Sequence, residues 1–241
     1  MKQIWSKSLA CLLCLALLVG MLPVAALAED NPPANGEVSL LADAASVKYL
    51  DENGQEQPCD SATVVTENVT SWGGSDGREY WYVVNRDVAI SGRIEVTGNV
   101  HLILADECSL TVSTGIKVND TNCLTIYAQS TGEDMGTLDV KSIGNLAGIG
   151  SGDGGVGGPG GTVTINGGTV IATGGDKGAG IGGGYRGAGG KITINGGIVV
   201  ANGGNWGAGI GGGQVGAGGA ITISAGTGKG TSRGNAAGIG G

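Results

Sequence analysis

Several residue types that common enzyme sites depend on are scarce in this chain. Its 241 residues include no phenylalanine, one histidine (His101), five prolines and five cysteines. Downstream of residue 28 there is no CxxC pair and no Cys/His spacing of the kind that binds zinc. A nucleophilic Cys/His pair also has almost nothing to be built from. We therefore expect no metal ion, no cofactor and no catalytic residue.

Basic residues and helical patterns are also scarce. Residues 29–143 carry 19 acidic and 6 basic side chains, and residues 144–241 carry 2 and 5, with no basic cluster in either part. This distribution argues against nucleic acid as a partner. From Arg93 onward no apolar pattern with a 3.6-residue period is long enough for a helix, so the chain is expected to consist of strands and turns.

Glycine is abundant and is arranged periodically. Of the 52 glycines, 41 fall in residues 144–241, a composition that by itself would allow a disordered tail. However, TVTINGG, KITINGG and AITISAG begin at residues 162, 191 and 220, at intervals of 29 residues, and AGIG occurs at 147, 179, 208 and 237. A fixed period with apolar residues held in phase indicates units that stack on copies of themselves.

The chain divides into four expected segments. Residues 1–28 have two lysines, an apolar run and a small-x-small ending, which together predict a signal peptide cleaved after Ala28. The protein is then expected to be secreted or at the cell surface, with no membrane span after cleavage. The alternative is that residues 1–28 are themselves a membrane span. Residues 29–45 are expected to form a flexible leader, 46–92 an N-terminal β cap, and 93–241 the repeats. Because the sequence stops halfway through a unit, we expect either a truncated record or an open last coil capable of end-to-end association.

Removal of residues 1–28 would leave three cysteines, an odd number that argues against a disulfide framework. One disulfide bridge with one free thiol, or three buried thiols, both remain open for Cys59, Cys108 and Cys123.

The upstream strands can be aligned with the repeats on three faces, which predicts a three-sided parallel β-solenoid. On the second face, alternation along each strand predicts inward ladders made of the following pairs: Leu102 and Leu104, Leu124 and Ile126, Val163 and Ile165, Ile192 and Ile194, Ile221 and Ile223. At one corner Asn166, Asn195 and Ser224 are expected to form a side-chain ladder; two independent Asn-Gly turns are the alternative.

The segments YLDENGQEQPC, YWYVVNRDVAISGRIEVTGNVHLILADECSLTVSTGIKV and LTIYAQS, together with the AGIGG and TVTINGG units, resemble a known group of sequences. They are similar to glycine-rich, signal-bearing surface or secreted proteins of Gram-positive gut anaerobes, and more loosely to the right-handed parallel β-helix carbohydrate-binding domains of clostridial secreted proteins. The resemblance covers about Val47 to Gly241. It implies an all-β, right-handed parallel β-helix with an extracellular binding or scaffolding role.

Two surfaces are candidates for ligand binding. The outward position of the second face is expected to hold Ile103 and then a threonine column, Thr125, Thr164, Thr193 and Thr222, whose spaced hydroxyls suit a polysaccharide or ice; the alternative is that threonine simply favours exposed strand positions. The second candidate is a pair of loops carrying Tyr185, Arg186, Asn205 and Trp206, since sugar rings stack on aromatic faces. Whether these loops meet on one face stays open at this stage.

Motifs for other functions are weak. GxGxxG occurs at residues 150–155, 178–183 and 207–212, among other places, but nucleotide binding is not expected because no helix follows it. Asp153 and Asp176 lie at unmatched phases, which argues against a calcium ladder, and the acidic residues of the repeats are too few for a polysaccharide lyase. The prediction is therefore an exported, non-catalytic β-solenoid that binds a polysaccharide or surface glycan. A structural spacer or assembly scaffold is the alternative, and a lyase-like enzyme comes third.

Overall fold

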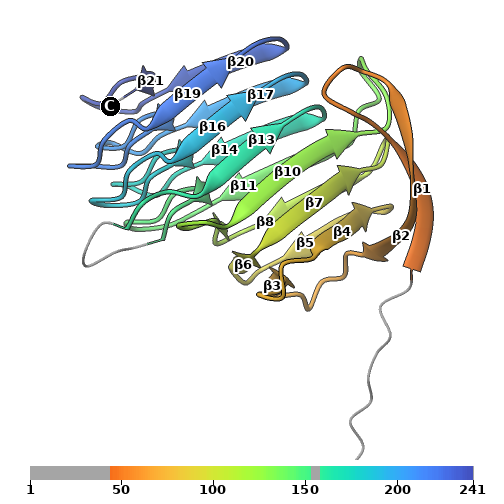
Figure 1. Ribbon diagram of the computed structural model, residues 1–241. Coiled ribbons are helices and arrows are strands. Elements are labelled where there is room, and N and C mark those ends of the chain that lie inside the picture. Colours follow the sequence, from red (N-terminus) through yellow and green to blue (C-terminus); the bar gives the residue numbers. More distant parts are fainter. Residues whose placement is uncertain (1–43, 153–157, 241) are drawn as a thin grey trace, which may run out of the picture. The chain divides into compact units, whose positions relative to one another are not determined.

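The computed structural model describes residues 44–152 and 158–240. The expected signal peptide and almost all of the expected leader lie outside the described residues, as do Asp153 and Gly241. Ala44 and Ala45, expected in the leader, belong instead to the first strand. The described chain coils into a parallel β-helix with three sheets, so the predicted three-sided solenoid is confirmed (Figure 1). Its predicted right-handedness stays a prediction.

The three sheets take one strand each from every coil. Sheet A contains β1 (Ala44–Leu50), β2 (Glu56–Val64), β4 (Glu79–Val84), β7 (Asn99–Leu104), β10 (Cys123–Ala128), β13 (Thr162–Ile165), β16 (Lys191–Ile194) and β19 (Ala220–Ile223). Sheet B contains β3 (Ser71–Gly73), β6 (Ile94–Thr97), β9 (Ile116–Lys117), β12 (Ile149–Gly150), β15 (Ile181–Gly182), β18 (Ile210–Gly211) and β21 (Ile239–Gly240). Sheet C contains β5 (Val88–Ile90), β8 (Ser109–Val112), β11 (Thr137–Lys141), β14 (Thr169–Thr173), β17 (Ile198–Asn202) and β20 (Thr227–Thr231).

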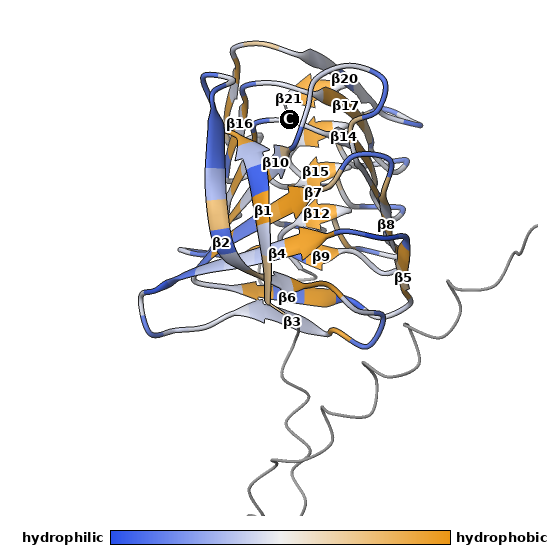
Figure 2. Cartoon of the chain, turned by 90° about the vertical axis from the view of Figure 1, so that its right-hand side faces the viewer, coloured by the Kyte–Doolittle hydropathy of each residue, from blue (hydrophilic) through white to orange (hydrophobic). Residues whose placement is uncertain are grey.

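Alternation along each strand places one aliphatic set inside the coil. In sheet A the register joins Leu102, Ile126, Ile165, Ile194 and Ile223, and the first four of these are fully buried. Sheet C contributes Leu110, Leu138, Val170 and Val199, and sheet B contributes Ile94, Ile116, Ile149, Ile181 and Ile210. Figure 2 shows β9, β12 and β15 of sheet B as hydrophobic segments. Each coil thus shares its apolar surface and its backbone hydrogen bonds with its neighbours, as in other stacked-repeat proteins.

The register of the upstream coil differs from the prediction by two residues. Val100 pairs with Leu124 and Leu102 with Ile126, so the expected alignment of Leu102 and Leu104 with Leu124 and Ile126 is wrong. Alternation gives no warning, because the segment has apolar residues at positions 100, 102 and 104 and two registers both bury aliphatic pairs. One consequence is that His101, and not Ile103, precedes Thr125 in the outward column.

Glycine is required where successive coils touch at the corners. Gly182 has φ +131°, which L side chains rarely adopt, and a Cβ there would overlap the carbonyl oxygen of Gly211 in the next coil. Gly150 and Gly211 repeat this geometry at the same position of their coils. The second glycine of the first three AGIG phrases is therefore required by both backbone conformation and coil spacing.

The β-helix begins earlier than expected. Residues 71–90, placed by sequence in a separate cap, form a complete coil in which β3, β4 and β5 pair in parallel with β6, β7 and β8. Trp72 is fully buried, and its ring centroid lies 5.5 Å from that of Tyr82 in the interior. Aromatic side chains thus fill this coil where glycine-spaced isoleucines fill the later ones, which is why the repeat pattern does not reveal it.

The distinctive N-terminal feature is a hairpin. β1 and β2 are antiparallel, and β2 joins β4 in sheet A. In Figure 1 the hairpin runs along the right-hand side, past the ends of β4, β7 and β10. Its side chains cover an outer cluster on sheet A, in which Tyr49 contacts Trp81 and Tyr127 at ring-centroid distances of 5.0 and 4.7 Å. A second, smaller apolar core therefore lies outside the coil.

His101 is part of this outer cluster. Its ring stacks on Trp81 at 4.2 Å, and Nδ1 lies 3.1 Å from the hydroxyl oxygen of Tyr127. Burial lowers the pKa of His101 below its ordinary value, and the nearby Glu79 carboxylate opposes that shift. The neutral imidazole is therefore the form that the folded cluster favours.

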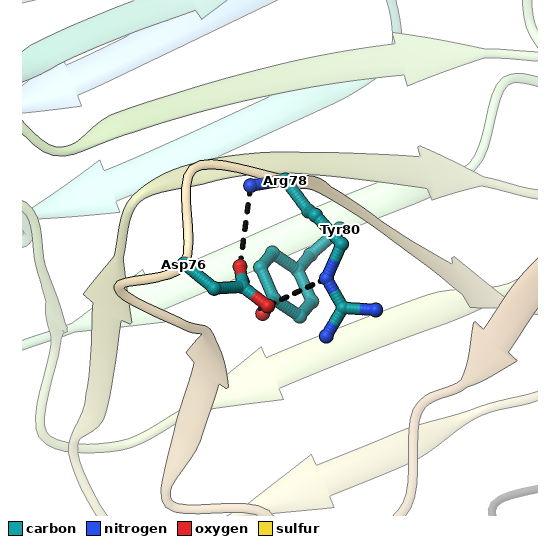
Figure 3. Close-up of polar contacts among 3 residues, drawn as sticks. All are labelled: Asp76, Arg78 and Tyr80. Atoms are coloured by element: carbon teal, nitrogen blue, oxygen red, sulfur yellow. Dashed lines mark hydrogen bonds and ion pairs between the residues drawn. The ribbon is translucent and has the colours of Figure 1, made fainter.

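A polar turn connects β3 to β4 in the first coil (Figure 3). Asp76 accepts hydrogen bonds from the Tyr80 hydroxyl at 2.7 Å and from the Arg78 backbone N–H at 3.2 Å, and its second oxygen pairs with Arg78 Nε. These donors, the Tyr80 hydroxyl first, lower the pKa of Asp76 to about 2. The turn is thus closed by one ionised carboxylate that is exposed to solvent.

Cys59, Cys108 and Cys123 are free thiols, so the possibility of a bridge among them is not realised. Within the described ranges, no helix has the length and apolarity needed to span a membrane.

Candidate functional site

Two columns of turns meet along one edge of the β-helix. One column connects sheet C to sheet B and includes residues 174–180 and 203–209; the other connects sheet B to sheet A and includes residues 183–190 and 212–219. The sheet B strands between them have two residues, a length of about 6.6 Å at the usual rise per residue. The turns are also joined directly, since the Ala179 N–H donates to Gly183 O at 2.8 Å and the Ala208 N–H to Gly212 O at 3.0 Å. We call this edge the loop corner.

The loop corner brings together the four loop residues predicted from sequence. Tyr185 and Arg186 lie in the turn after β15, and Asn205 and Trp206 lie in the turn before β18. Because the two turn columns are adjacent, residues from both gather on one edge. Tyr185 contacts Lys177 in the turn one coil before Trp206, but among the described residues no groove on this edge is lined by residues of both predicted loops.

Two cationic side chains lie close to the ring of Tyr185. Lys177 Nζ lies 4.6 Å from the centre of the tyrosine ring, and the Arg186 guanidinium carbon lies 5.0 Å from it. The Tyr185 N–H donates to Asn145 O in the preceding coil at 2.8 Å. Cation–π contacts on this ring therefore leave it less open than sequence reasoning assumed.

Trp206 is the more accessible aromatic residue. Its side chain is 46% exposed, and its backbone N–H donates to Asp176 O one coil earlier at 3.0 Å. The neighbouring Asn205 donates through Nδ2 to the Asp176 carboxylate at 2.5 Å. The indole is thus presented to solvent from a backbone fixed to the coil below.

Two shallow grooves lie on either side of this segment. The tryptophan groove has a volume of about 250 Å³ and is lined by Trp206, Gln214, Val215 and Asn235 together with alanine and glycine. The arginine groove, of about 520 Å³, includes Asp176, Asn205 and Arg233 along with Lys141, Ser142 and Ile143. Lys141 pairs with Asp139 at 3.3 Å, whereas Arg233 forms no salt bridge with any residue of the described ranges.

The threonine column lies on a different surface. Thr125, Thr164, Thr193 and Thr222 are in register on the outer face of sheet A, where Trp81 and His101 precede them. Thr125, Thr164 and Thr193 are half-buried and Thr222 is exposed. None of them lines either groove.

The expected asparagine ladder corner also follows sheet A. Asn195 Nδ2 donates to Asn166 Oδ1 at 2.9 Å. Ser224 occupies the next coil, and its backbone N–H donates to Ile194 O at 2.8 Å. The Asn166–Asn195 contact therefore links two successive coils through their side chains.

Sequence reasoning missed Gln214, Val215, Arg233 and Asn235 as groove residues. A signal for three of them was present, because Gln214, Val215 and Asn235 follow Tyr185, Arg186 and Trp206 by one 29-residue period. Since stacked coils place equivalent turns one above the other, candidate residues in one coil predict the lining residues in the next.

The part of the chain that the structure describes contains no cluster of side chains that could bind a metal ion. In those residues no three His, Cys, Asp or Glu side chains lie close enough together to hold a metal ion. In the arginine groove Asp176 is the only carboxylate among the described lining residues.

Comparison with known proteins supports the architecture. The family model described as Beta helix repeat matches the chain twice, at residues 163–185 and 192–214. These matches contain β14, β15, β17 and β18, all but the first residue of β13 and β16, and the turns 174–180 and 203–209 of the loop corner. No curated protein and no solved structure matches the chain.

Proposed function

We propose that this protein is an exported, non-catalytic β-helix module that binds a glycan at the loop corner, through the tryptophan groove and the adjoining arginine groove. The observation that carries the proposal is Trp206, an indole 46% exposed at the rim of a groove whose polar side chains are amides. Sugar rings pack their C–H faces on aromatic rings while amide and guanidinium groups pair with their hydroxyls. The signal-like residues 1–28 support export to the cell surface or medium.

The rigidity of the loop corner supports recognition. Backbone hydrogen bonds tie Trp206 to Asp176 and Gln214 to Lys177 in the preceding coil, at 3.0 and 2.9 Å. A surface fixed before binding loses less conformational entropy when a ligand arrives. The turns can therefore hold an aromatic ring and amides in place with few contacts.

The small number of carboxylates lining the two grooves supports glycan binding over glycan hydrolysis. Hydrolysis of a glycosidic bond ordinarily uses two carboxyl groups on either side of the bond. Asp176 is the single carboxylate among the described lining residues of both grooves, and Asn205 already donates to it. A lyase-like reaction would need clustered carboxylates around calcium as well.

A glycan array probed with the full chain, with and without calcium, tests the proposal. We expect Trp206→Ala to weaken binding by at least about tenfold, because truncating a central aromatic anchor typically costs more than about 1.4 kcal/mol. The matched control is Ile198→Ala, which removes another partly exposed large apolar side chain, on the outer face of sheet C. Circular dichroism melts should show that both variants remain folded.

Each alternative gives a distinct result. Absence of binding to every glycan on the array would favour the structural spacer. The double variant Thr164→Val/Thr193→Val tests the outer face of sheet A, and selective loss of binding there would move the site away from the loop corner. Release of unsaturated products from pectin or another uronan would overturn the non-catalytic part of the proposal.

A further inference from the structure

Val215 has an unusual backbone conformation at the rim of the tryptophan groove. It is a β-branched residue with φ +66°, and its side chain is 80% exposed. β-branched side chains are genuine outliers in this left-handed region, where glycine is favoured. The same coil uses glycine at its other left-handed positions, Gly211 and Gly219. A solvent-facing valine at this position therefore costs stability without filling the core, which points to a use outside the fold.

The surroundings of Val215 combine apolar surface with free amides. Trp206 is exposed on the facing turn, and Gln214 and Asn235 line the same groove. In residues 44–152 and 158–240, neither of these two side-chain amides forms a hydrogen bond with a protein group. None of the described lining residues is charged. The groove thus offers neutral donors and acceptors next to methyl groups and an aromatic ring.

We propose that the tryptophan groove is a subsite for the acetamido group of an N-acetylated amino sugar within a glycan. An acetamido group has a methyl, a carbonyl acceptor and an N–H donor. The methyl would pack on Val215 and Trp206, and the amide would pair with Gln214 and Asn235, each of which carries both donors and an acceptor. A plain hydroxyl in that place would leave the valine methyls against a polar group.

The size and charge of the groove agree with this ligand. Its volume of about 250 Å³ lies below the range of about 300–1,000 Å³ typical of sites that enclose drug-sized ligands, so it suits one unit of a longer chain. A carboxylated sugar would find no cation among the described residues that line it; the nearest groove with a free guanidinium is the one containing Arg233. The neutral substituent is therefore favoured here. This inference rests on the proposed glycan-binding function and names the ligand class for it.

Paired glycans that differ only in whether C2 carries an acetamido group or a hydroxyl test the subsite, for example hexa-N-acetylchitohexaose against cellohexaose, measured by calorimetry on the full chain. We expect wild type to prefer the acetylated member by about tenfold, the scale of one small apolar contact plus amide pairing. In Val215→Gly the preference should fall toward one, while the thermal midpoint rises because glycine tolerates the positive φ. Loss of the preference for the acetylated glycan together with a gain in stability is a result that a purely structural valine would not give.

Glu107→Gly is the matched control. Glu107 has φ +59° in the turn between β7 and β8 and lines neither groove. It should likewise raise the thermal midpoint and leave the preference for acetylated glycans unchanged. Gln214→Ala provides a second measurement, with an expected loss of preference that does not involve backbone strain.

The outcomes separate this inference from the function beneath it. Equal binding of every acetylated and unacetylated pair would overturn the acetamido subsite and leave glycan binding standing. An unchanged preference in both Val215→Gly and Gln214→Ala would likewise place the acetamido group elsewhere. Binding to no glycan at all would overturn both proposals.

Discussion

The interior ladder of sheet A can be tested with two isoleucines from the same coil. Ile165 in β13 is fully buried between Ile126 and Ile194, whereas Ile171 in β14 faces outward. Replacing Ile165 by alanine removes three buried carbons, which is about 2.4 kcal/mol of transfer free energy at about 0.8 kcal/mol per CH₂. A cavity term adds to this and gives a total of about 3–4 kcal/mol, within the range of about 2–5 kcal/mol for such substitutions.

The coil spacing explains why the cavity should persist. Parallel hydrogen bonds hold β13 between β10 and β16, so the neighbouring coils cannot move together to fill the gap. Ile171→Ala removes the same atoms from the outer face and is expected to cost less than about 1 kcal/mol. Urea denaturation of both variants, compared by midpoint at a common m value, gives the two free energies. Equal costs for the two substitutions would refute the assignment of inner and outer faces.

Two further perturbations act on single residues. Gly182→Ala should prevent accumulation of folded protein, because the positive φ and the carbonyl of the next coil both exclude a Cβ. The control Gly92→Ala should be tolerated, because there is open space around Gly92. Soluble yield and circular dichroism measure the difference. Since burial lowers the pKa of His101, the unfolded state takes up a proton first, and stability should fall as pH drops below about 6.5. His101→Phe keeps the stacking position on Trp81 and should remove this pH dependence of the thermal midpoint, whereas an unchanged slope between pH 5 and 7 would assign it to other groups.

The sequence was most informative where the period is strict. From residue 162 onward, equal spacing fixes which residues lie above one another, so the pairs Val163–Ile192 and Ile165–Ile194 were predicted correctly. Upstream, the intervals between equivalent strands vary and the segment around Leu102 accepts two registers with similar burial. There the lengths of the turns decide the pairing, and apolar alternation alone cannot supply that information.

The first coil illustrates a second limit. Its interior holds Trp72, which pairs with Val96, and Tyr82, which stands in the column of Leu102 and Ile126. A repeat is recognised from residues that recur, whereas a β-helix requires only that each coil fill its own cross-section. The same coil geometry can thus be built from a segment with no resemblance to the repeat, and this is the segment that sequence reasoning placed in a cap.

The 29-residue period alone could not predict the loop corner, because the corner depends on how close two turns of the same coil lie to each other. A period of 29 residues predicts that Trp206 and Asn235 lie in successive coils, but not that the turn carrying Gln214 lies next to Trp206 in the same coil. That proximity follows from the two-residue length of β18 and from the hydrogen bond between Ala208 and Gly212. The AGIG phrase therefore has two consequences: its isoleucine fills the core, and the two-residue strand that it forms brings the two turn columns together. A longer strand in sheet B would have preserved the fold and separated the residues that form the groove.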